Sequence, residues 1–255
     1  MIKTITYDNG DKYAGQIKND KRHGIGSCVF ANGNVYEGDW FEGKKHGQGV
    51  LKFKSGAMYR GNWENDKKNG KGAYVFAGQK SFYDGFWVAN KQSGFGTIGF
   101  ENGDKYMGMW ENGKMHGSGI YTWDNGNKYD GGFDNGAFHG TGRITYIKGG
   151  SYEGDWINDK RHGEGLLYIS DTNGYKGTWE NDARHGKGTY FFANGERYEG
   201  QWVNNKKQGK GTYTYPNGDV YQGTWENDLM HGDFVIAYKA GRQERVKYSH
   251  NKRIG

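Results

Sequence analysis

Residues 152 to 165 read YEGDWINDKRHGEG, a stretch that places acids beside a Lys-Arg-His run. Side chains of these types can act as general acids and bases or hold a phosphate, so the stretch could form a catalytic loop. A similar stretch recurs at residues 13 to 26, 36 to 49 and 175 to 188. Because a catalytic loop is rarely built more than once, this recurrence favours a structural repeat over an active site.

The composition is unusual for a globular chain of 255 residues. Hydrophobic residues make up 33%, below the roughly 45–50% that is typical, and glycine accounts for 47 residues. Aromatic residues nevertheless reach 16%, whereas disordered chains are poor in them. Abundant aromatics and glycines with a single proline, Pro216, predict many short strands joined by tight turns.

Cysteine content and charge narrow the class of protein. Cys28 is the only cysteine, which excludes a secreted scaffold held by internal disulfides. The sequence contains neither an N-glycosylation sequon nor an apolar run of the length of a signal peptide or membrane span. We therefore expect an intracellular protein of the cytoplasm or cytoskeleton. The net charge of +6, with 29 acids beside 35 Lys and Arg, is too balanced to predict a nucleic-acid partner.

An internal repeat dominates the chain. Its units begin at tyrosines spaced 23 residues apart, except for 24 residues between Tyr59 and Tyr83; we count repeat positions from this tyrosine as position 1. Position 3 is glycine in all ten units, and position 5 is tryptophan in eight. Position 12 is always glycine, and position 14 is glycine except for Phe234 in the last unit. The ten tyrosines are Tyr13, Tyr36, Tyr59, Tyr83, Tyr106, Tyr129, Tyr152, Tyr175, Tyr198 and Tyr221.

Each unit is predicted to be a β-hairpin. Side chains alternate along a strand, so positions 1, 3 and 5 share a face of one strand, and positions 12, 14, 16 and 18 share a face of the next. Polar tips such as NDKR and turns such as ANG separate these strands. The glycines leave space for Tyr and Trp rings to cover bare backbone. The predicted fold is all-β, an elongated antiparallel rod of about ten hairpins, roughly 95 Å long at the usual strand spacing.

The two ends of the repeat array are expected to be caps. Residues 1–12 match the second half of a unit and are expected to pair with the first hairpin as a half-repeat cap. Ten repeats then occupy residues 13–241. Residues 242–255 depart from the pattern and are charged, as expected of a C-terminal cap or tail that protects a sheet edge.

The unit Y-x-G-x-W followed by H-G-x-G and an aromatic-x-x-G turn resembles the MORN repeat (membrane occupation and recognition nexus) over essentially the whole chain. Such repeats occur in ciliary radial spoke heads, in junctophilins that hold membranes together and in cytoskeletal scaffolds of protists. They also occur attached to lysine methyltransferase or phosphoinositide kinase domains, and we expect no such catalytic domain here. The resemblance therefore implies a stand-alone array like that of radial spoke heads.

The histidines do not suggest catalysis. Seven of the eight stand at position 11, where Asn69, Ser93 and Gln208 replace them in other units, and a general base would not survive such replacement. These seven are also expected to lie about 10 Å apart, one per hairpin, too far to share a metal ion. Strand glycines likewise explain the G-x-G pairs better than a phosphate loop does. We predict no catalytic residue, no metal and no cofactor.

Basic pairs at the hairpin tips form a predicted row that could meet an anionic membrane or an acidic partner. The simpler interpretation is a solvated surface that keeps an aromatic sheet soluble, because acids such as Asp66 stand directly before several pairs. The members of this basic row are Lys21, Arg22, Lys44, Lys45, Lys67, Lys68, Lys160, Arg161, Lys206 and Lys207.

Units four to six break the pattern with apolar residues at positions that should face solvent. Exposed apolar clusters commonly mark protein interfaces, although repacking around the extra residue of unit three could explain part of this set. The candidates are Phe86, Phe95, Met107, Met109, Met115 and Phe138.

The sequence thus predicts a non-enzymatic scaffold or protein-interaction module, most plausibly in a ciliary axoneme or the cytoskeleton. Its expected partners are other proteins, either an extended segment or another MORN protein, including a second copy of the chain. The alternative is a peripheral membrane module that binds anionic phospholipids through the basic row.

Overall fold

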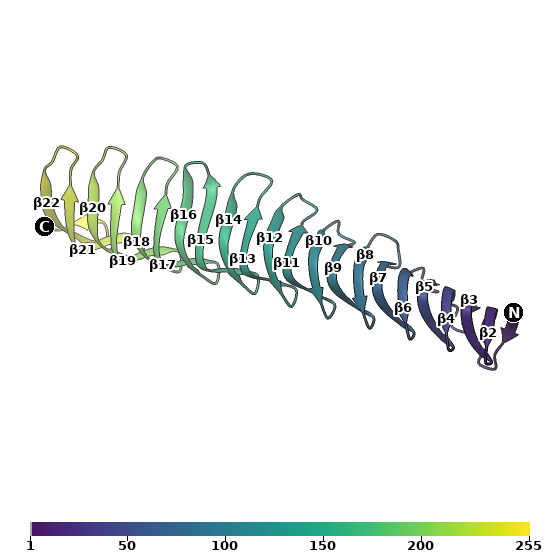
Figure 1. Ribbon diagram of the computed structural model, residues 1–255. Coiled ribbons are helices and arrows are strands. Elements are labelled where there is room, and N and C mark those ends of the chain that lie inside the picture. The colour runs from purple at the N-terminus through teal and green to yellow at the C-terminus, as the bar shows by residue number, and fades with distance from the viewer. Residues whose placement is uncertain (1) are drawn as a thin grey trace. The chain divides into compact units, whose positions relative to one another are not determined.

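A computed structural model describes residues 2–255, and this part of the chain contains strands and no helix. Contacts divide the chain into two compact units, Met1–Asp124 and Asn125–Gly255. Within each unit, neighbouring strands pair in an antiparallel manner in the order of the sequence (Figure 1). The predicted all-β array of hairpins is confirmed.

The strands of the first unit are β1 (Ile2–Thr6), β2 (Lys12–Lys18), β3 (Lys21–Val29), β4 (Val35–Phe41), β5 (Lys44–Lys52), β6 (Met58–Glu64), β7 (Lys67–Val75), β8 (Phe82–Val88), β9 (Lys91–Gly99), β10 (Lys105–Glu111) and β11 (Lys114–Thr122). The strands of the second unit are β12 (Lys128–Asp134), β13 (Ala137–Thr145), β14 (Ser151–Ile157), β15 (Lys160–Ser170), β16 (Asn173–Glu180), β17 (Ala183–Phe191), β18 (Arg197–Val203), β19 (Lys206–Thr214), β20 (Val220–Glu226), β21 (Leu229–Ala237), β22 (Gln243–Ser249) and β23 (Lys252–Arg253).

The hairpin tips are two-residue turns in which both residues have positive φ. Asn19 and Asp20, with φ of 49° and 57°, join β2 to β3, and this geometry matches the twist of antiparallel strands. Asn, Asp and Gly tolerate the left-handed region, which explains why they fill these tips. The tips also hold neighbouring hairpins together: the Asp182 carboxylate accepts a hydrogen bond from the Arg161 backbone N–H at 3.0 Å.

Each hairpin contains a bulge that the alternation rule does not foresee. In the first hairpin, Gly15 pairs with Gly26 and Ile17 pairs with Arg22, so the single residue Gln16 opposes three residues. Position 12 therefore adopts positive φ, 62° at Gly24, and a Cβ there would collide with the Gln16 side chain. Gly24 thus faces the side of position 4. The prediction that position 12 shares the face of positions 14 and 16 is wrong, because a bulge interrupts alternation.

The aromatic side of the sheet is a layer of Tyr and Trp rings over glycine backbone. Tyr13 covers Gly15 and Gly26, whose Cβ atoms would collide with its ring. Its hydroxyl donates a hydrogen bond to the Gln16 carbonyl at 2.7 Å. The indole N–H of the next unit, that of Trp40, donates to the Gly26 carbonyl at 3.1 Å. The predicted covering of bare backbone by rings is therefore confirmed for the tyrosines.

Tyr and Trp rings of successive units meet edge to face within the layer. Trp63 lies 5.5 Å from the Tyr36 ring and 5.0 Å from the Tyr59 ring, with interplanar angles near 90°. Such arrangements contribute about 0.5–1.5 kcal/mol per pair beyond area burial. Nine of the ten position-1 tyrosines are almost completely buried, from Tyr13 to Tyr198. This layer is the core.

The two ends of the array continue the hairpin pattern. Strand β1 pairs with β2, with Ile5 opposite Tyr13, as expected of the half-repeat. Strands β22 and β23 form a further hairpin that pairs with β21, with Val246 opposite Phe234. Phe234 takes the place of a tyrosine ring over Gly223 and is 1% exposed, while Tyr221 is only partly buried.

Candidate interaction surfaces

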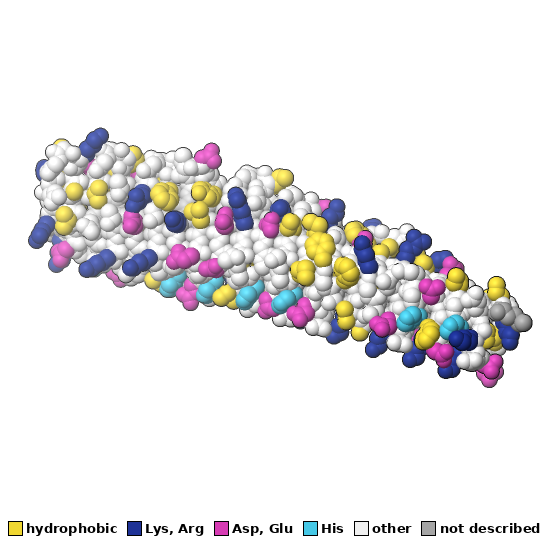
Figure 2. All heavy atoms as spheres, viewed as in Figure 1, with side chains coloured by type: hydrophobic (Ala, Val, Ile, Leu, Met, Phe, Trp, Pro, Cys, Tyr) yellow, Lys and Arg dark blue, Asp and Glu magenta, His cyan; other side chains and the backbone are white. Residues whose placement is uncertain are grey.

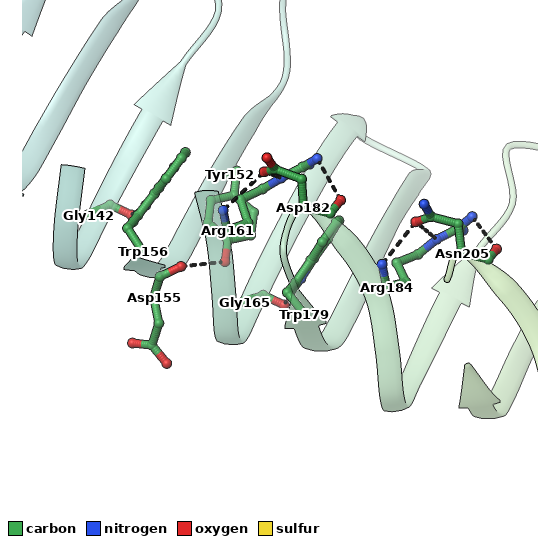
Figure 3. A network of polar contacts seen from close by, with 10 residues as sticks. All are labelled: Gly142, Tyr152, Asp155, Trp156, Arg161, Gly165, Trp179, Asp182, Arg184 and Asn205. Atoms are coloured by element: carbon green, nitrogen blue, oxygen red, sulfur yellow. Dashed lines mark hydrogen bonds and ion pairs between the residues drawn. The ribbon is translucent and has the colours of Figure 1, made fainter. Parts of the chain in front are cut away.

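The stretch at residues 152–165 is one layer of this repeat (Figure 3). The Tyr152 hydroxyl donates to the Asp155 carbonyl at 3.1 Å, and the Trp156 indole donates to the Gly142 carbonyl at 3.0 Å. The Asp155 carboxylate accepts a hydrogen bond from the Glu164 backbone N–H at 3.0 Å. Hydrogen bonds of this stretch therefore stabilise the bulge of its hairpin.

The structure divides the basic row into two classes of residue. The second member of each pair, at position 10, lies over the indole of the following unit instead of in solvent. The Arg161 guanidinium is 4.3 Å from the Trp179 ring centroid, and Lys68 Nζ is 4.1 Å from that of Trp87 (Figure 3 shows Arg161). Arg22, Lys45, Arg184 and Lys207 repeat the contact with Trp40, Trp63, Trp202 and Trp225 at 4.3 Å to 5.0 Å.

Burial lowers the pKa of three of these cations. Loss of hydration lowers the pKa of Lys68 to about 8 and lowers the pKa of Lys207 and of Arg184. The aromatic faces oppose this effect because they favour the charged form. The position-10 cations are therefore part of the aromatic layer, and their availability to a lipid headgroup is small.

The first member of each pair, at position 9, is exposed. In the compact unit Met1–Asp124, position 9 is lysine in every hairpin. Lys91 and Lys114 therefore join Lys21, Lys44 and Lys67 in an exposed row. Lys21 also forms an ion pair with Glu42 at 2.9 Å. In the compact unit Asn125–Gly255, the exposed lysines at position 9 are Lys160 and Lys206. Lys91 and Lys114 are not part of the predicted basic row, because each of these two lysines precedes an uncharged residue and so does not form a basic pair.

Four of the six apolar candidates lie together on the outer face, the side of the sheet opposite the aromatic layer (Figure 2). Phe95 on β9 is directly opposite Met109 on β10, and Phe86 is on the adjacent strand β8. Phe86, Phe95, Met107 and Met109 are each 43–52% exposed. We refer to these four residues as the apolar patch. Phe82, 39% exposed on β8, adjoins it and was missed because it precedes the first position of its unit.

Met115 and Phe138 lie elsewhere. Both occupy position 10, where most units carry the stacked cation. Met115 pairs with Trp110, so its side chain is on the aromatic side. Phe138, in the second unit, stacks on Tyr129 at 3.8 Å and contacts Trp156 edge to face. Their apolar character thus serves the aromatic layer and not the apolar patch.

The extra residue of unit three does not account for the apolar patch. It lies in the turn between β7 and β8, where the Phe76 N–H donates to the Ser81 carbonyl and Gln79 has positive φ. The pairing of β7 with β8 is regular, with Gly72 opposite Gly85. The insertion is absorbed by the turn.

The outer face of the second unit forms a groove of about 1150 Å³ across β15–β21, lined mostly by charged and polar side chains. Lys187, Glu199 and Lys210 are among its lining residues, and so is Phe191, which is 42% exposed. Glycine backbone forms part of the lining, as at Gly188 and Gly211. The two units therefore present outer faces of different chemistry.

Three of the position-11 histidines, His116, His185 and His231, approach glutamates of their own hairpins, as in the 3.3 Å approach of His185 Nδ1 to Glu180. Asn69 donates to Glu64 in the same way. One group differs: atoms of Glu226, His231 and His250 lie within 4.8 Å of one another, as metal ligands could. The sequence pattern does not predict this group, because His250 lies outside the ten predicted repeats.

No helix capable of spanning a membrane occurs in residues 2–255. Comparison with curated proteins found no match. Among solved structures, the chain is similar to the TCP10 domain of Danio rerio CPAP in complex with a peptide of Danio rerio STIL, at 14% identity and a TM-score of 0.33. That alignment covers 100% of this chain and 98% of the other.

The SAS-4 (dCPAP) TCP domain of Drosophila Melanogaster in complex with a Proline Rich Motif of Ana2 (dSTIL) is similar at 11% identity and a TM-score of 0.25, covering 97% of this chain and 90% of the other. Scores this low carry no argument about partners.

The family comparison is specific. The MORN repeat model matches ten segments, at residues 13–35, 36–58, 59–79, 83–105, 106–128, 129–151, 152–173, 175–197, 198–220 and 221–232. These segments carry the tyrosines, glycines and tryptophans of the aromatic layer, and the family favours a non-catalytic scaffold or binding module. The chain belongs to the MORN repeat family.

Proposed function

We propose that the protein is a scaffold that binds other proteins through its outer face, with the apolar patch as the main contact. The observation that carries this proposal is the grouping of Phe86, Phe95, Met107 and Met109 on adjacent strands, each about half exposed. Exposed apolar clusters of this kind commonly bind proteins, and methionine adapts to differently shaped partners. A ciliary axoneme or cytoskeletal assembly is the proposed setting, by resemblance to stand-alone MORN proteins.

The expected partner is a protein segment with apolar side chains. The rim of the patch contains Lys71, which is opposite Phe86, and Asp84, which is on the same strand as Phe86. Charges of both signs at a rim favour orientation and specificity more than affinity. An apolar segment flanked by charges therefore fits this surface better than a uniformly acidic one.

A pull-down from extracts of the source cells tests the proposal. The variant carries Phe86→Ser, Met107→Ser and Met109→Ser, and the matched control is Phe191→Ser on the outer face of the second unit. We expect the triple variant to lose its specific partners while the control retains them. Unchanged recovery with the triple variant would contradict the proposal. If the wild type is a dimer and the triple variant a monomer by analytical ultracentrifugation, the partner is a second copy.

The alternative function is binding of anionic phospholipids, for which the exposed position-9 lysines provide the support. Five of them follow one another in the first unit at about 10 Å per hairpin, and each would contribute roughly 1 kcal/mol near an anionic surface. Sedimentation with phosphatidylserine vesicles tests it, using Lys44→Gln, Lys67→Gln and Lys91→Gln together. The control is Lys187→Gln on the outer face. Binding that is absent, or that survives the triple change, excludes this function.

A further inference from the structure

Glu226, His231 and His250 form a set of side chains that the proposed function does not use. Glu226 and His231 make a contact that other repeats also make. His231 Nδ1 lies 3.9 Å from Glu226 Oε2, and in an earlier repeat His185 Nδ1 lies 3.3 Å from Glu180 Oε2. A carboxylate beside a position-11 histidine is therefore not by itself a site.

The third member comes from the following hairpin tip. Position 11 of one unit adjoins position 7 of the next: the Gln208 side chain accepts a hydrogen bond from the Asn227 N–H at 3.0 Å, and Asn69 accepts one from Ala89. Position 7 is asparagine in most hairpins, but in the hairpin of β22 and β23 it is His250. A second imidazole is thereby brought against a position-11 histidine.

The resulting geometry brings three donor atoms together. His250 Nε2 is 3.7 Å from the carboxylate oxygen Glu226 Oε2 that His231 also approaches, and the two imidazole centroids are 4.7 Å apart. His231 Nδ1 is a buried atom with no hydrogen-bond partner in residues 2–255, as is Nδ1 of His23, His46 and His185, so the approach of His250 is what distinguishes this histidine. Ligands of a tetrahedral zinc ion at about 2.1 Å lie roughly 3.4 Å from one another. The two histidine–glutamate distances exceed this spacing by about 0.5 Å and 0.3 Å, and all three donor atoms lie within 4.8 Å of one another, so side-chain movements of at most about 1.4 Å close the set around an ion.

We propose that Glu226, His231 and His250 bind a divalent transition metal ion of the zinc class. Two imidazole nitrogens and one carboxylate oxygen suit zinc and its neighbours, whereas magnesium and calcium prefer all-oxygen sites. Three protein ligands leave the fourth position for water. The His250 side chain is 56% exposed, so an ion can reach the set from solvent.

The ion would clamp the β22–β23 hairpin onto the hairpin of β20 and β21. Strand β23 contributes only two residues to the sheet, and Ser249 and Tyr248 are its pairing partners. A metal bond between His250 and His231 therefore adds a connection at the tip where few backbone pairs are made. This inference is independent of partner binding by the outer face.

The chain itself offers substitutions that preserve the fold. His250→Asn introduces the residue that most units carry at position 7, where asparagine tolerates positive φ. His231→Asn introduces the residue of unit three at position 11, Asn69. The matched control is His185→Asn, which removes a histidine beside a glutamate where position 7 of the next unit is Asn204.

Isothermal titration of the tag-free, chelator-treated chain with Zn²⁺, and visible absorption with Co²⁺, test the site. We expect one ion per chain, an affinity lowered about tenfold or more by His250→Asn and by His231→Asn, and no change with His185→Asn. We also expect Zn²⁺ to raise the unfolding temperature of the wild type but not of His250→Asn. Absence of binding, wild-type affinity in either site variant, or an equal loss of affinity in the His185→Asn control would overturn the proposal.

Discussion

The two faces of the sheet follow different rules. On the aromatic side, most units repeat the same contacts: a tyrosine over two glycines, a tryptophan bonded to a glycine carbonyl, and a cation over that tryptophan. On the outer face, the residues change from unit to unit, from the apolar patch on β8–β10 to the polar groove on β15–β21. The difference teaches that the aromatic face specifies the fold and leaves the outer face free to specify a partner.

The outer face can vary because it contributes little to the core. Thr189 and Phe191 belong to the polar groove, while Tyr190 between them faces the aromatic layer. Changes at such neighbouring positions should therefore have very different effects. The predictions below test this contrast, beginning with the largest expected effect.

High pH should unfold the protein through the aromatic face. Burial raises the pKa of the position-1 tyrosines from Tyr13 to Tyr198 above their usual 10. Their stabilisation is complete below pH 10 and is lost as pH rises above it, because the unfolded state then releases protons that the folded state retains. Each tyrosine contributes at most about 1.4 kcal/mol per pH unit.

Urea unfolding between pH 8 and pH 11, followed by tryptophan fluorescence, measures this dependence. We expect the free energy of unfolding to fall steeply above pH 10, together with a rise in tyrosinate absorption. A stability that is flat to pH 11 would show that these rings are not buried in solution.

Substitution of a glycine under a tyrosine ring should have the next largest effect. Gly188→Ala places a methyl group against the Tyr175 ring and should lower the free energy of unfolding by about 3 kcal/mol, as overpacking of a filled core does. Thr189→Ala, one residue along on the outer face, should change it by less than about 0.5 kcal/mol. Thermal and urea unfolding compare the two. An equal loss of unfolding free energy in the two variants would contradict the different roles of the two faces.

Removal of a stacked cation should have a smaller effect. Arg184→Met deletes the contact with Trp202 at 4.4 Å and the guanidinium hydrogen bond to the Asn205 carbonyl at 2.9 Å. Met115 shows that methionine fits position 10, so we expect a loss of about 1–2 kcal/mol without misfolding. Lys187→Met, on the outer face, is the matched control and should leave the unfolding midpoint in place.

Serine substitutions in the apolar patch should have the smallest effect on stability. Met107→Ser and Met109→Ser remove half-exposed side chains, and each should cost less than about 1 kcal/mol, within the range of strand propensity. Circular dichroism and thermal unfolding of each variant measure this. A cooperative loss of structure would mean that the patch is core and not a binding surface.

The sequence predicts the hairpins and the aromatic layer well because these depend on local spacing. It does not predict the bulge: alternation places Gly24 on the aromatic side, whereas one residue opposing three reverses that assignment. The basic row shows the same limit of pattern reading. Lys67 and Lys68 look equivalent as neighbours, but only Lys68 is directed over Trp87, because that contact depends on the next hairpin.

The sequence pattern likewise does not predict the contacts between side chains of neighbouring repeats. Phe138 and Phe86 both look like misplaced apolar residues, yet Phe138 fills a cation position in the aromatic layer and Phe86 is on the outer face. His250 falls in the predicted C-terminal cap or tail, but the pairing of β22 with β21 brings it to His231. Repeat positions predict such neighbours only once the stacking register of hairpins is known.

Site-specific photocrosslinking tests the central claim most directly. A benzoylphenylalanine at position 95 in the apolar patch is compared with one at position 191 beside the polar groove, since Phe95 and Phe191 are 52% and 42% exposed on the same type of face. After irradiation in the source cells, we expect discrete protein adducts from position 95, competed by excess wild-type chain, and few from position 191. Equal adducts from the two positions, or none from position 95, would contradict binding through the apolar patch.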